Sequence, residues 1–416
     1  MNRPHSSFII HRSSLQNMRL LFLTDNFPPE VNAPASRTFE HCREWVQAGH
    51  QVTVITCAPN FPQGKVYAGY KNKLYQVEEM SGIRVIRVWS YITANEGFVK
   101  RILDYISFAV MAVFVGLFRR CDLIVATSPQ FFTAVGGCVL AFLKRKPWVM
   151  EVRDLWPESI KAVGAMREGR MYHLLERLEL FLYRHARAVV VVTDAFKENL
   201  RTRGIPEEKI YVIKNGVLLD QFSPRPKDAA LVAELGLEGK FVLAYLGTHG
   251  MAHALDFVLR ASAALPEDVR ILLIGDGAEK AKLLKIKEEG RFDKVFMLPS
   301  VTKTEIARYI AVSDVALVNL QKSDTFKTVI PSKIFENAAM QKPILLGVEG
   351  ESKVLIEQYG AGLCFEPENE IDFLEKTMHL RVVETYGKCQ EGCTRLAQDF
   401  NRKTLAVRML GILEKL

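Results

Sequence analysis

Several common catalytic signatures are missing from this chain of 416 residues. It has no Asp-x-Asp triplet, so it lacks the paired carboxylates through which many enzymes hold a divalent metal against nucleotide phosphates. It also has no Walker A phosphate loop, no Gly-x-Ser-x-Gly turn and no strict Gly-x-Gly-x-x-Gly fingerprint. These absences argue against the commonest NTPases, serine hydrolases and dinucleotide-binding enzymes, and we expect neither a metal nor a resident cofactor.

A disulfide framework and a membrane-spanning segment are also missing. The seven cysteines are odd in number and lie mostly in apolar segments, which indicates free thiols in a reducing compartment. The longest apolar run, Tyr105–Phe118, has fourteen residues, whereas a spanning helix needs about 20. Residues 1–17 contain no signal peptide pattern, and we predict that they form a disordered extension.

The net positive charge of the chain comes entirely from its first half. Residues 1–200 contain 25 Lys and Arg against 17 Asp and Glu, whereas residues 201–416 contain 30 of each. The whole net charge of +8 therefore belongs to the first half. Such an excess predicts an anionic partner for that half, either nucleic acid or an anionic membrane surface.

The run Tyr105–Phe118 bears on that choice because basic residues flank it on both sides. Lys100 and Arg101 precede it, and Arg119 and Arg120 follow it. A helix of this kind either lies in a membrane interface or packs as a buried core helix. The charge distribution favours the membrane, so we predict a peripheral protein on the cytoplasmic face of the plasma membrane that binds no nucleic acid.

Apolar, β-branched runs recur along the chain between helical stretches. Continuous apolar strands that alternate with helices predict parallel sheets covered on both faces, and so two doubly wound, Rossmann-like α/β domains. The predicted strands are Arg19–Thr24, Val52–Thr56, Ile83–Trp89, Leu123–Thr127, Trp148–Val152, Val189–Thr193, Ile210–Ile213, Phe241–Leu246, Arg270–Ile274, Val295–Leu298, Val315–Leu320 and Pro343–Gly347.

The break between the domains is expected at Asn215–Asp228, a polar stretch with two prolines. We assign residues 18–220 to a first domain and residues 221–400 to a second domain. The helical segment 401–416 is expected to pack back on the first domain. Ligands of such sheets bind at the carboxyl ends of the strands, so a site is predicted in the cleft between the domains.

The segment Ile330–Leu345 is the most informative of these strand-end regions. Its sequence predicts a turn and then a helix with Lys333, Glu336 and Asn337 on one face of its first turns. An ammonium at a helix start suits a phosphate, and a carboxylate one turn further on can accept hydrogen bonds from ribose hydroxyls. An ordinary lysine–glutamate pair on a solvated helix is the alternative.

Two glycine turns follow strands of the second domain. Gly247, Thr248, His249 and Gly250 lead from a strand into a helix, where backbone amides can approach a diphosphate. Gly275 and Asp276 end the next predicted strand and are candidates for lining a nucleotide pocket. Plain turns would use the same residues.

Polar and aromatic residues also gather at strand ends of the first domain. Arg153, Asp154 and Trp156 follow a strand, and a carboxylate beside an indole suits a sugar, with a buried Arg–Asp pair as the alternative. Glu30 and Arg37 lie in the loop and helix start after the first strand. We expect these five residues to lie near one another at the rim of the cleft, where a sugar could bind.

Taken together, the segments resemble GT-B glycosyltransferases of family 4 over nearly the whole chain from Met18. The resemblance is strongest to N-acetyl-L-fucosamine transferases of surface-polysaccharide (O-antigen or capsule) assembly. The segments that carry it are Phe27–Arg37, Gly49–Pro62, Glu151–Ser159, Ile210–Val217, Leu272–Gly277, Ser313–Val318 and Ile330–Leu345.

The resemblance implies a retaining, metal-independent transfer of a hexosyl or N-acetylaminosugar group from a nucleotide sugar, with a UDP-linked donor and a lipid-linked saccharide acceptor. Glu336 matches the family glutamate that binds the donor ribose, Lys333 lies where a cation meets the diphosphate, and Gly247–Gly250 matches the phosphate loop. Asp154 and Lys333 are the catalytic candidates. On this resemblance the first domain binds the acceptor and the second domain binds the nucleotide sugar. The residues assigned to acceptor binding are Glu30, Arg37, Arg153, Asp154 and Trp156. The chain departs from the family at Thr328, where a first glutamate is usual.

Two other functions remain open from the sequence. A UDP-sugar epimerase or hydrolase on the same fold would need acid and base groups that converge from both domains, of which the sequence offers Asp154 and His249. A non-enzymatic membrane or nucleic-acid adaptor would account for the basic first half without a reaction.

Overall fold

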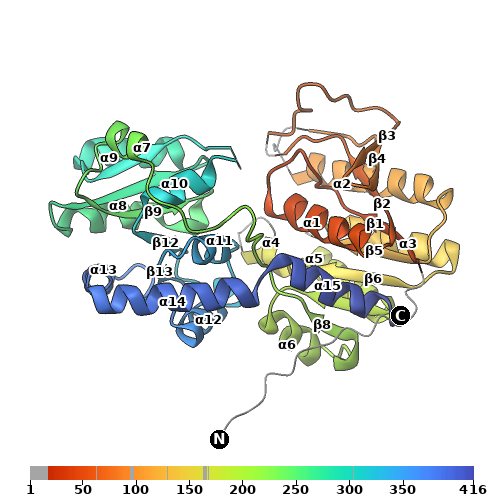
Figure 1. Ribbon diagram of the computed structural model, residues 1–416. Coiled ribbons are helices and arrows are strands. Elements are labelled where there is room, and N and C mark those ends of the chain that lie inside the picture. Colours follow the sequence, from red (N-terminus) through yellow and green to blue (C-terminus); the bar gives the residue numbers. More distant parts are fainter. Residues whose placement is uncertain are drawn as a thin grey trace, which may run out of the picture.

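The computed structural model describes residues 17–61, 63–93, 98–128, 130–162, 166, 168–302 and 304–416. Two α/β units lie side by side, each built on its own sheet (Figure 1). The strand order is β3-β4-β2-β1-β5-β6-β7-β8 in the first sheet and β11-β10-β9-β12-β13-β14 in the second. The strands of the first sheet are β1 (Arg19–Leu23), β2 (Gln51–Cys57), β3 (Tyr75–Met80), β4 (Ile83–Val88), β5 (Leu123–Thr127), β6 (Trp148–Val152), β7 (Ala188–Val191) and β8 (Ile210–Val212). Those of the second are β9 (Phe241–Leu246), β10 (Val269–Ile274), β11 (Val295–Leu298), β12 (Val315–Asn319), β13 (Ile344–Gly347) and β14 (Gly362–Cys364).

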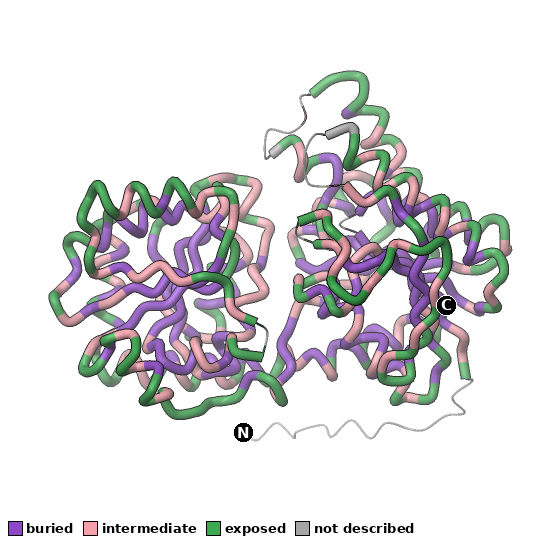
Figure 2. Tube along the Cα trace, turned by 90° about the horizontal axis from the view of Figure 1, so that it is seen from above, coloured by how far each residue is buried: buried purple, intermediate pink, exposed green. Residues whose placement is uncertain are grey.

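The predicted fold of two doubly wound parallel-sheet domains is confirmed. Central strands such as β5, β6 and β7 are buried along their whole length, as expected for strands covered by helices on both faces. Figure 2 shows the buried chain concentrated in the two sheets. The sequence missed β3 and β14, both at sheet edges, and β3 pairs antiparallel with β4.

Helices cover the first sheet in two layers. One layer packs α2 (Phe98–Leu117), α3 (Phe131–Lys144), α5 (Arg170–His185) and α6 (Asp194–Thr202) on one face of the sheet. The opposite face is covered by α1 (Ala33–Gln47) and α15 (Arg402–Leu413). Among the described residues, no helix combines the length and the apolar character needed to cross a membrane.

The second sheet is also enclosed by helices, and a short helix follows β6 in the first unit. Helix α11 carries Lys333 and Glu336, as the sequence predicted for a helix in this segment. The remaining helices are α4 (Glu158–Ala162), α7 (Ala229–Glu234), α8 (Leu255–Ala261), α9 (Lys280–Gly290), α10 (Ile306–Val312), α11 (Lys333–Ala339), α12 (Glu351–Tyr359), α13 (Glu370–His379) and α14 (Val383–Asp399).

The end of the chain ties the two units together. Helix α14 lies along the second unit, and α15 crosses back to pack on α1 of the first (Figure 1). At the crossing Asn401 pairs with Val217 of the connecting segment, and the Trp45 indole donates to the Ala406 carbonyl at 2.9 Å. The connection is therefore a double one, through residues near 217 and near 401.

A carboxylate bridges the units on another side. Glu351, at the start of α12 in the second unit, accepts hydrogen bonds at 2.8 Å from the backbone N–H groups of Asp194 and Ala195 at the start of α6. Lys214 of the first unit lies 3.4 Å from the same carboxylate. A carboxylate at a helix N-terminus is favoured by the unpaired amides and the helix dipole.

We expect Glu351→Ala to loosen the contact between the units, because it leaves two α6 amides without their acceptor. Small-angle scattering of the variant should show a larger radius of gyration or a broader distance distribution than the wild type. Glu357→Ala on the same helix is the matched control, since the Glu357 carboxylate is exposed and forms an ion pair within its own helix, with Lys353 at 3.9 Å. Identical scattering for Glu351→Ala and the wild type would contradict this role.

Candidate active site

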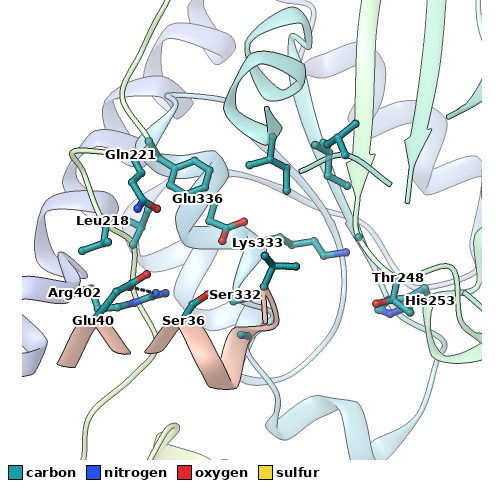
Figure 3. Close-up of a pocket in the computed structure, with 18 residues that line it drawn as sticks. Ser36, Glu40, Leu218, Gln221, Thr248, His253, Ser332, Lys333, Glu336 and Arg402 are labelled. Carbon is teal, nitrogen blue, oxygen red and sulfur yellow. Dashed lines mark hydrogen bonds and ion pairs between the residues drawn. The ribbon is translucent and has the colours of Figure 1, made fainter. Parts of the chain in front are cut away.

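A cavity of about 270 Å³ lies between the two units (Figure 3). Its second-domain wall comes from the loop after β9 and from α11, and its first-domain wall from α1 and the loop before it. Residues of the connecting segment and of α15 close one side. The polar residues that line it are Ser36, Glu40, Gln221, Thr248, His253, Ser332, Lys333, Glu336 and Arg402.

Lys333 extends along the second-domain wall toward Thr248 and His253 (Figure 3). Its ammonium lies 3.7 Å from the centroid of the Tyr245 ring, and Nζ is buried without a hydrogen-bond partner among the described residues. Burial lowers the pKa of Lys333 to about 7, and the nearby Glu336 carboxylate opposes that effect. A cation in this setting is stabilised by an anionic ligand that supplies the missing hydrogen bonds.

Glu336 occupies the next turn of α11 and points toward the side of Gln221 (Figure 3). Lys333 and Glu336 therefore address different ends of the cavity from one helix face. Ser332, the N-cap residue of α11, also lines the cavity, and its side chain forms no capping hydrogen bond. Asn337 is buried in the helix packing, where its amide donates to the Lys333 carbonyl at 2.8 Å, and it does not line the cavity.

Two glycine turns meet beneath the Lys333 side chain. Gly247 has φ of 143°, and a Cβ there would lie 2.9 Å from the Lys333 Nζ. Gly275 has φ of 152°, and a Cβ there would lie 1.8 Å from the Gly247 carbonyl oxygen. Both positions thus require glycine, one for the passage of the lysine and the other for the contact between the turns.

His249 holds the two turns together and does not reach the cavity. Its side chain is fully buried, and its backbone N–H donates to the Asp276 carbonyl at 2.9 Å. Burial lowers the pKa of His249 to about 4, so the ring is neutral at physiological pH. Asp276 is exposed, and neither it nor Gly275 or Gly250 lines the cavity.

His253 lines the cavity instead of His249. It ends a short 3-10 turn at 251–253, and its carbonyl accepts a hydrogen bond from the Asn319 amide at 2.9 Å. Burial lowers the pKa of His253 to about 4, with the Lys333 charge acting in the same direction. Near neutral pH the imidazole of His253 is therefore neutral, and Lys333 is the one of these two groups that carries positive charge, fully so only below pH 7.

The first-domain wall is formed by Ser36 and Glu40, one turn apart on α1. Glu40 is paired with Arg402 of α15, whose guanidinium also donates to the Gly216 carbonyl. Arg402 thus links the first unit, the connecting segment and the returning helix at the edge of the cavity (Figure 3).

Arg153 and Asp154 line a second cavity between the units, of about 260 Å³. It shares Ala33 and Ser332 with the first cavity, so the two adjoin. Arg153 has a buried Nη1 atom without a hydrogen-bond partner among the described residues. Burial lowers the pKa of Arg153 to about 10, against the effect of Glu151, and the group remains a cation.

The other three residues assigned to the acceptor serve the first domain internally. Glu30 is buried and accepts the backbone N–H groups of Asn60 and Phe61 at 2.8 and 2.9 Å. Arg37 is 1% exposed and forms a buried ion pair with Glu151 at 2.9 Å. Neither group lines one of the two cavities, and the contacts named here tie both groups to other parts of the first domain.

Trp156 is also a core residue. Its ring stacks on Phe131 at a centroid distance of 5.3 Å and an angle of 7°, and Phe132 meets it edge-on. An indole whose face is covered in this way has no surface to offer a sugar ring. The correction follows from α3, whose first residues fill the space that the sequence left open.

Lys327, a basic residue six positions before Lys333, forms ion pairs outside the cavity. Its ammonium lies 2.7 Å from Asp324 and 3.6 Å from Glu349, and it does not line the cavity. Thr328 ends the same 3-10 turn and donates to the Thr325 carbonyl at 3.1 Å. Within the described residues, no group of three His, Cys, Asp or Glu side chains is arranged to hold a metal ion.

Comparison with known families agrees with this geometry. Residues 32–216 match the glycosyl transferase 4-like domain, and residues 240–381 match the glycosyl transferases group 1 domain. The two matches cover more than three quarters of the chain. The chain is therefore built of two glycosyltransferase domains.

Among individual relatives, the colanic acid biosynthesis glycosyl transferase WcaI of Escherichia coli K12 is 26% identical over 367 residues, which cover 85% of this chain and 89% of the relative. Among solved structures, Anabaena Alr3699/HepE in complex with UDP and glucose has a TM-score of 0.70 at 18% identity and covers 96% and 100% of the two chains. The sucrose-phosphate synthase of Thermosynechococcus elongatus has a TM-score of 0.78 at 16% identity, with coverage of 96% and 98%. These likenesses establish the GT-B fold.

The buried lysine predicts a definite pH dependence of ligand binding. A diphosphate bound in this cavity would pair with the protonated form of Lys333, which predominates below pH 7 in the free protein. Between pH 7 and the higher pKa of the bound state, binding must take up a proton, so affinity should fall up to about tenfold per pH unit.

Titration calorimetry with UDP-glucose is a suitable measurement, because its doubly esterified diphosphate does not titrate in this range. Buffers of different ionisation enthalpy should reveal proton uptake at pH 8 and none at pH 6. Lys333→Gln should bind weakly with no such difference. Equal affinities of the wild type at pH 6 and pH 9 would show that Lys333 does not contact the diphosphate.

Proposed function

We propose that this protein is a retaining, metal-independent glycosyltransferase of surface-polysaccharide assembly. The donor is a UDP-linked sugar of the N-acetyl-L-fucosamine type, and the acceptor is a lipid-linked saccharide of an O-antigen or capsule pathway. The observation that carries the proposal is that one wall of an interdomain cavity carries both the carboxylate of Glu336 and the buried ammonium of Lys333, which has no hydrogen-bond partner among the described residues.

The cavity fits the two halves of a nucleotide sugar. Lys333 can neutralise the diphosphate, and Glu336, one turn further along α11, can accept hydrogen bonds from ribose hydroxyls. Gly247 brings backbone close to the phosphate position because no Cβ intervenes. The comparison with HepE, solved with UDP and glucose, supports a UDP-linked donor, and WcaI supports a role in polysaccharide biosynthesis.

Departure of the diphosphate is the step that the site assists most. As the bond between the sugar carbon and the phosphate oxygen breaks, negative charge grows on the diphosphate near Lys333. A fixed cation in a cavity shielded from water stabilises that charge without reorganisation. Retention follows when the acceptor hydroxyl attacks from the face that the diphosphate leaves, and its proton can pass to a leaving phosphate oxygen.

The acceptor is expected in the adjoining cavity beside Arg153 and Asp154. The two cavities meet at Ala33 and Ser332, so an acceptor held there approaches the sugar end of the donor. Arg153 provides a cationic group with an unpartnered N–H, and Asp154 provides a carboxylate for hydroxyl groups. Lys333 and Asp154 are thus the two catalytic candidates, one on each side of the cleft.

A UDP-sugar epimerase or hydrolase is the competing function for the same fold. It would need an acid and a base at the sugar carbon, and His249, one of the two groups that the sequence offered, is buried away from both cavities. Conversion of UDP-sugar to an epimer or to free sugar without an acceptor would identify this alternative.

Kinetics of two α11 variants test the donor site. Lys333→Ala should lower kcat on the order of 100-fold, because the lost interaction strengthens as diphosphate charge develops. Glu336→Ala should raise the donor KM roughly tenfold or more with a smaller effect on kcat, because ribose binding is equal in the ground and transition states.

Lys353→Ala on α12 is the matched control, since Lys353 is exposed and remote from the cavity. NMR of the product should show the donor's anomeric configuration retained. Wild-type turnover by both α11 variants would refute the donor site, and an inverted product would refute the retaining mechanism.

Chelation tests metal independence. Activity should be unchanged in excess EDTA, because Lys333 and backbone amides, and not a divalent cation, neutralise the diphosphate. The matched control is a metal-dependent glycosyltransferase assayed in the same buffer. Loss of activity on chelation, with recovery on adding magnesium or manganese, would contradict the proposal.

A further inference from the structure

The outer side of α2 is apolar although it faces away from the sheet. Leu103, Ile106, Val110, Phe114 and Leu117 follow the spacing of one helix face, and all are exposed. Phe108, Ala112 and Val115 face the sheet on the other side. A soluble helix normally carries polar residues on its outer side, so this second apolar face calls for a cover.

Helix α3 extends the apolar surface. It packs against both α2 and α5 in the same layer over the first sheet. Its residues Val139, Phe142 and Leu143 are exposed, with Phe142 81% exposed, and Phe118 at the end of α2 is 70% exposed. An apolar groove between α2 and β3 adjoins them.

Basic residues surround the ends of α2 and α3. Among the described residues none of these side chains forms an ion pair, whereas nearby Asp122 is taken by Arg19 at 2.6 Å. Arg119 lies over the Tyr75 ring, and Lys144 donates to the Leu117 carbonyl at 2.9 Å. The residues of this cluster are Arg119, Arg120, Lys144, Arg145 and Lys146.

Helix α5 combines both characters in a single stripe. Arg170, Leu174, Arg177, Phe181 and Arg184 succeed one another at alternating spacings of four and three residues, and all five are exposed. The buried residues Tyr172, Glu179, Leu182 and Tyr183 lie on the opposite side of the helix. The stripe therefore points away from the sheet, as do the exposed faces of α2 and α3.

We propose that the outer faces of α2, α3 and α5 form one docking surface for an anionic lipid bilayer. The apolar side chains enter the interface, and the eight basic residues of the cluster and the stripe meet lipid phosphates. Charge complementarity selects this occupant. A second copy of the chain would bring the same unpaired cations face to face, and nucleic acid would leave the aliphatic side chains of α2 uncovered.

The proposal deepens the proposed function, because a lipid-linked acceptor would be presented at such a surface. The two can fail separately, since vesicle binding is measured without donor or acceptor. Loss of activity with normal vesicle binding would affect the reaction alone.

Cosedimentation with vesicles tests the surface in the full-length protein. The wild type should bind vesicles containing phosphatidylglycerol at low salt, bind pure phosphatidylcholine weakly, and lose affinity as salt rises. Arg170→Gln, Arg177→Gln and Arg184→Gln combined should reduce partitioning on the order of 100-fold, at about fivefold per residue. Phe142→Ser should reduce it about tenfold or more.

Matched variants of the second domain serve as controls. Lys282→Gln, Lys285→Gln and Lys287→Gln on α9 together remove the same charge, and Ile371→Ser alters a side chain that is 80% exposed. Both should bind vesicles like the wild type. Circular dichroism melting curves should show all four variants folded, since every changed side chain lies at the protein surface.

Three results would overturn the proposal. One is a wild-type protein that ignores anionic vesicles at low salt, and another is equal loss of binding in the α9 and α5 variants. The third is a wild-type dimer in sedimentation velocity that Phe142→Ser converts to a monomer, which would assign the surface to a second copy of the chain.

Discussion

The Lys333 ammonium is buried and has no hydrogen-bond partner in the described part of the chain. Its burial costs on the order of a few kcal/mol, and the lowered pKa of Lys333 reflects this cost. The second domain arranges several features around it. Tyr245 supplies its ring face, Gly247 leaves the space through which the side chain passes, and Glu336 contributes an opposing charge. A site that retains such a cost in the empty state regains it when an anion arrives, which is how strain at a functional site becomes binding energy.

That lysine can act only if the opposite wall is correctly placed, and the chain secures the wall at two points. Arg402 joins Glu40 of α1 to the carbonyl of Gly216, so the returning helix, the connecting segment and the first domain meet at the rim of the cavity. Glu351 joins α12 to the start of α6 and lies near Lys214. One contact is a buried ion pair and the other engages backbone amides, so opening the cleft would expose different groups on each side.

The sequence alone predicted where the central strands lie and that Lys333 and Glu336 share one face of a helix, because local sequence pattern determines both features. Buried parallel strands are continuous apolar runs, and residues three apart on a helix share a face whatever surrounds them. The edge strand β3 escaped notice because its alternating residues are only half-buried and its partner is antiparallel.

Other site residues depend on contacts that no local pattern contains. Arg37 and Ser36 are neighbours on α1, yet Ser36 lines the cavity while Arg37 points inward to Glu151, more than a hundred residues away. From the sequence, the face of the Trp156 ring was expected to be available to a sugar, but Phe131 of α3 stacks on it. The role of Arg402 could not be read from a helix at the end of the chain, since its partners lie near residues 40 and 216. The position of His253 in the cavity lining, in place of His249, depends on a three-residue 3-10 turn that the sequence analysis did not predict.

The helix layers on the two faces of the first sheet differ in what their outer sides expose. One face is covered by α1 and α15, and α15 in turn is fastened to the second domain through α14, so that layer is tied to the cleft. The other layer, formed by α2, α3 and α5, has its inner side in the core but leaves aromatic, aliphatic and basic side chains outward. A domain that only had to bind an acceptor from solution would gain solubility from polar residues there. Apolar side chains in those places, together with cations that form no ion pair among the described residues, are consistent with a division in which one layer maintains the cleft and the other meets a surface outside the molecule.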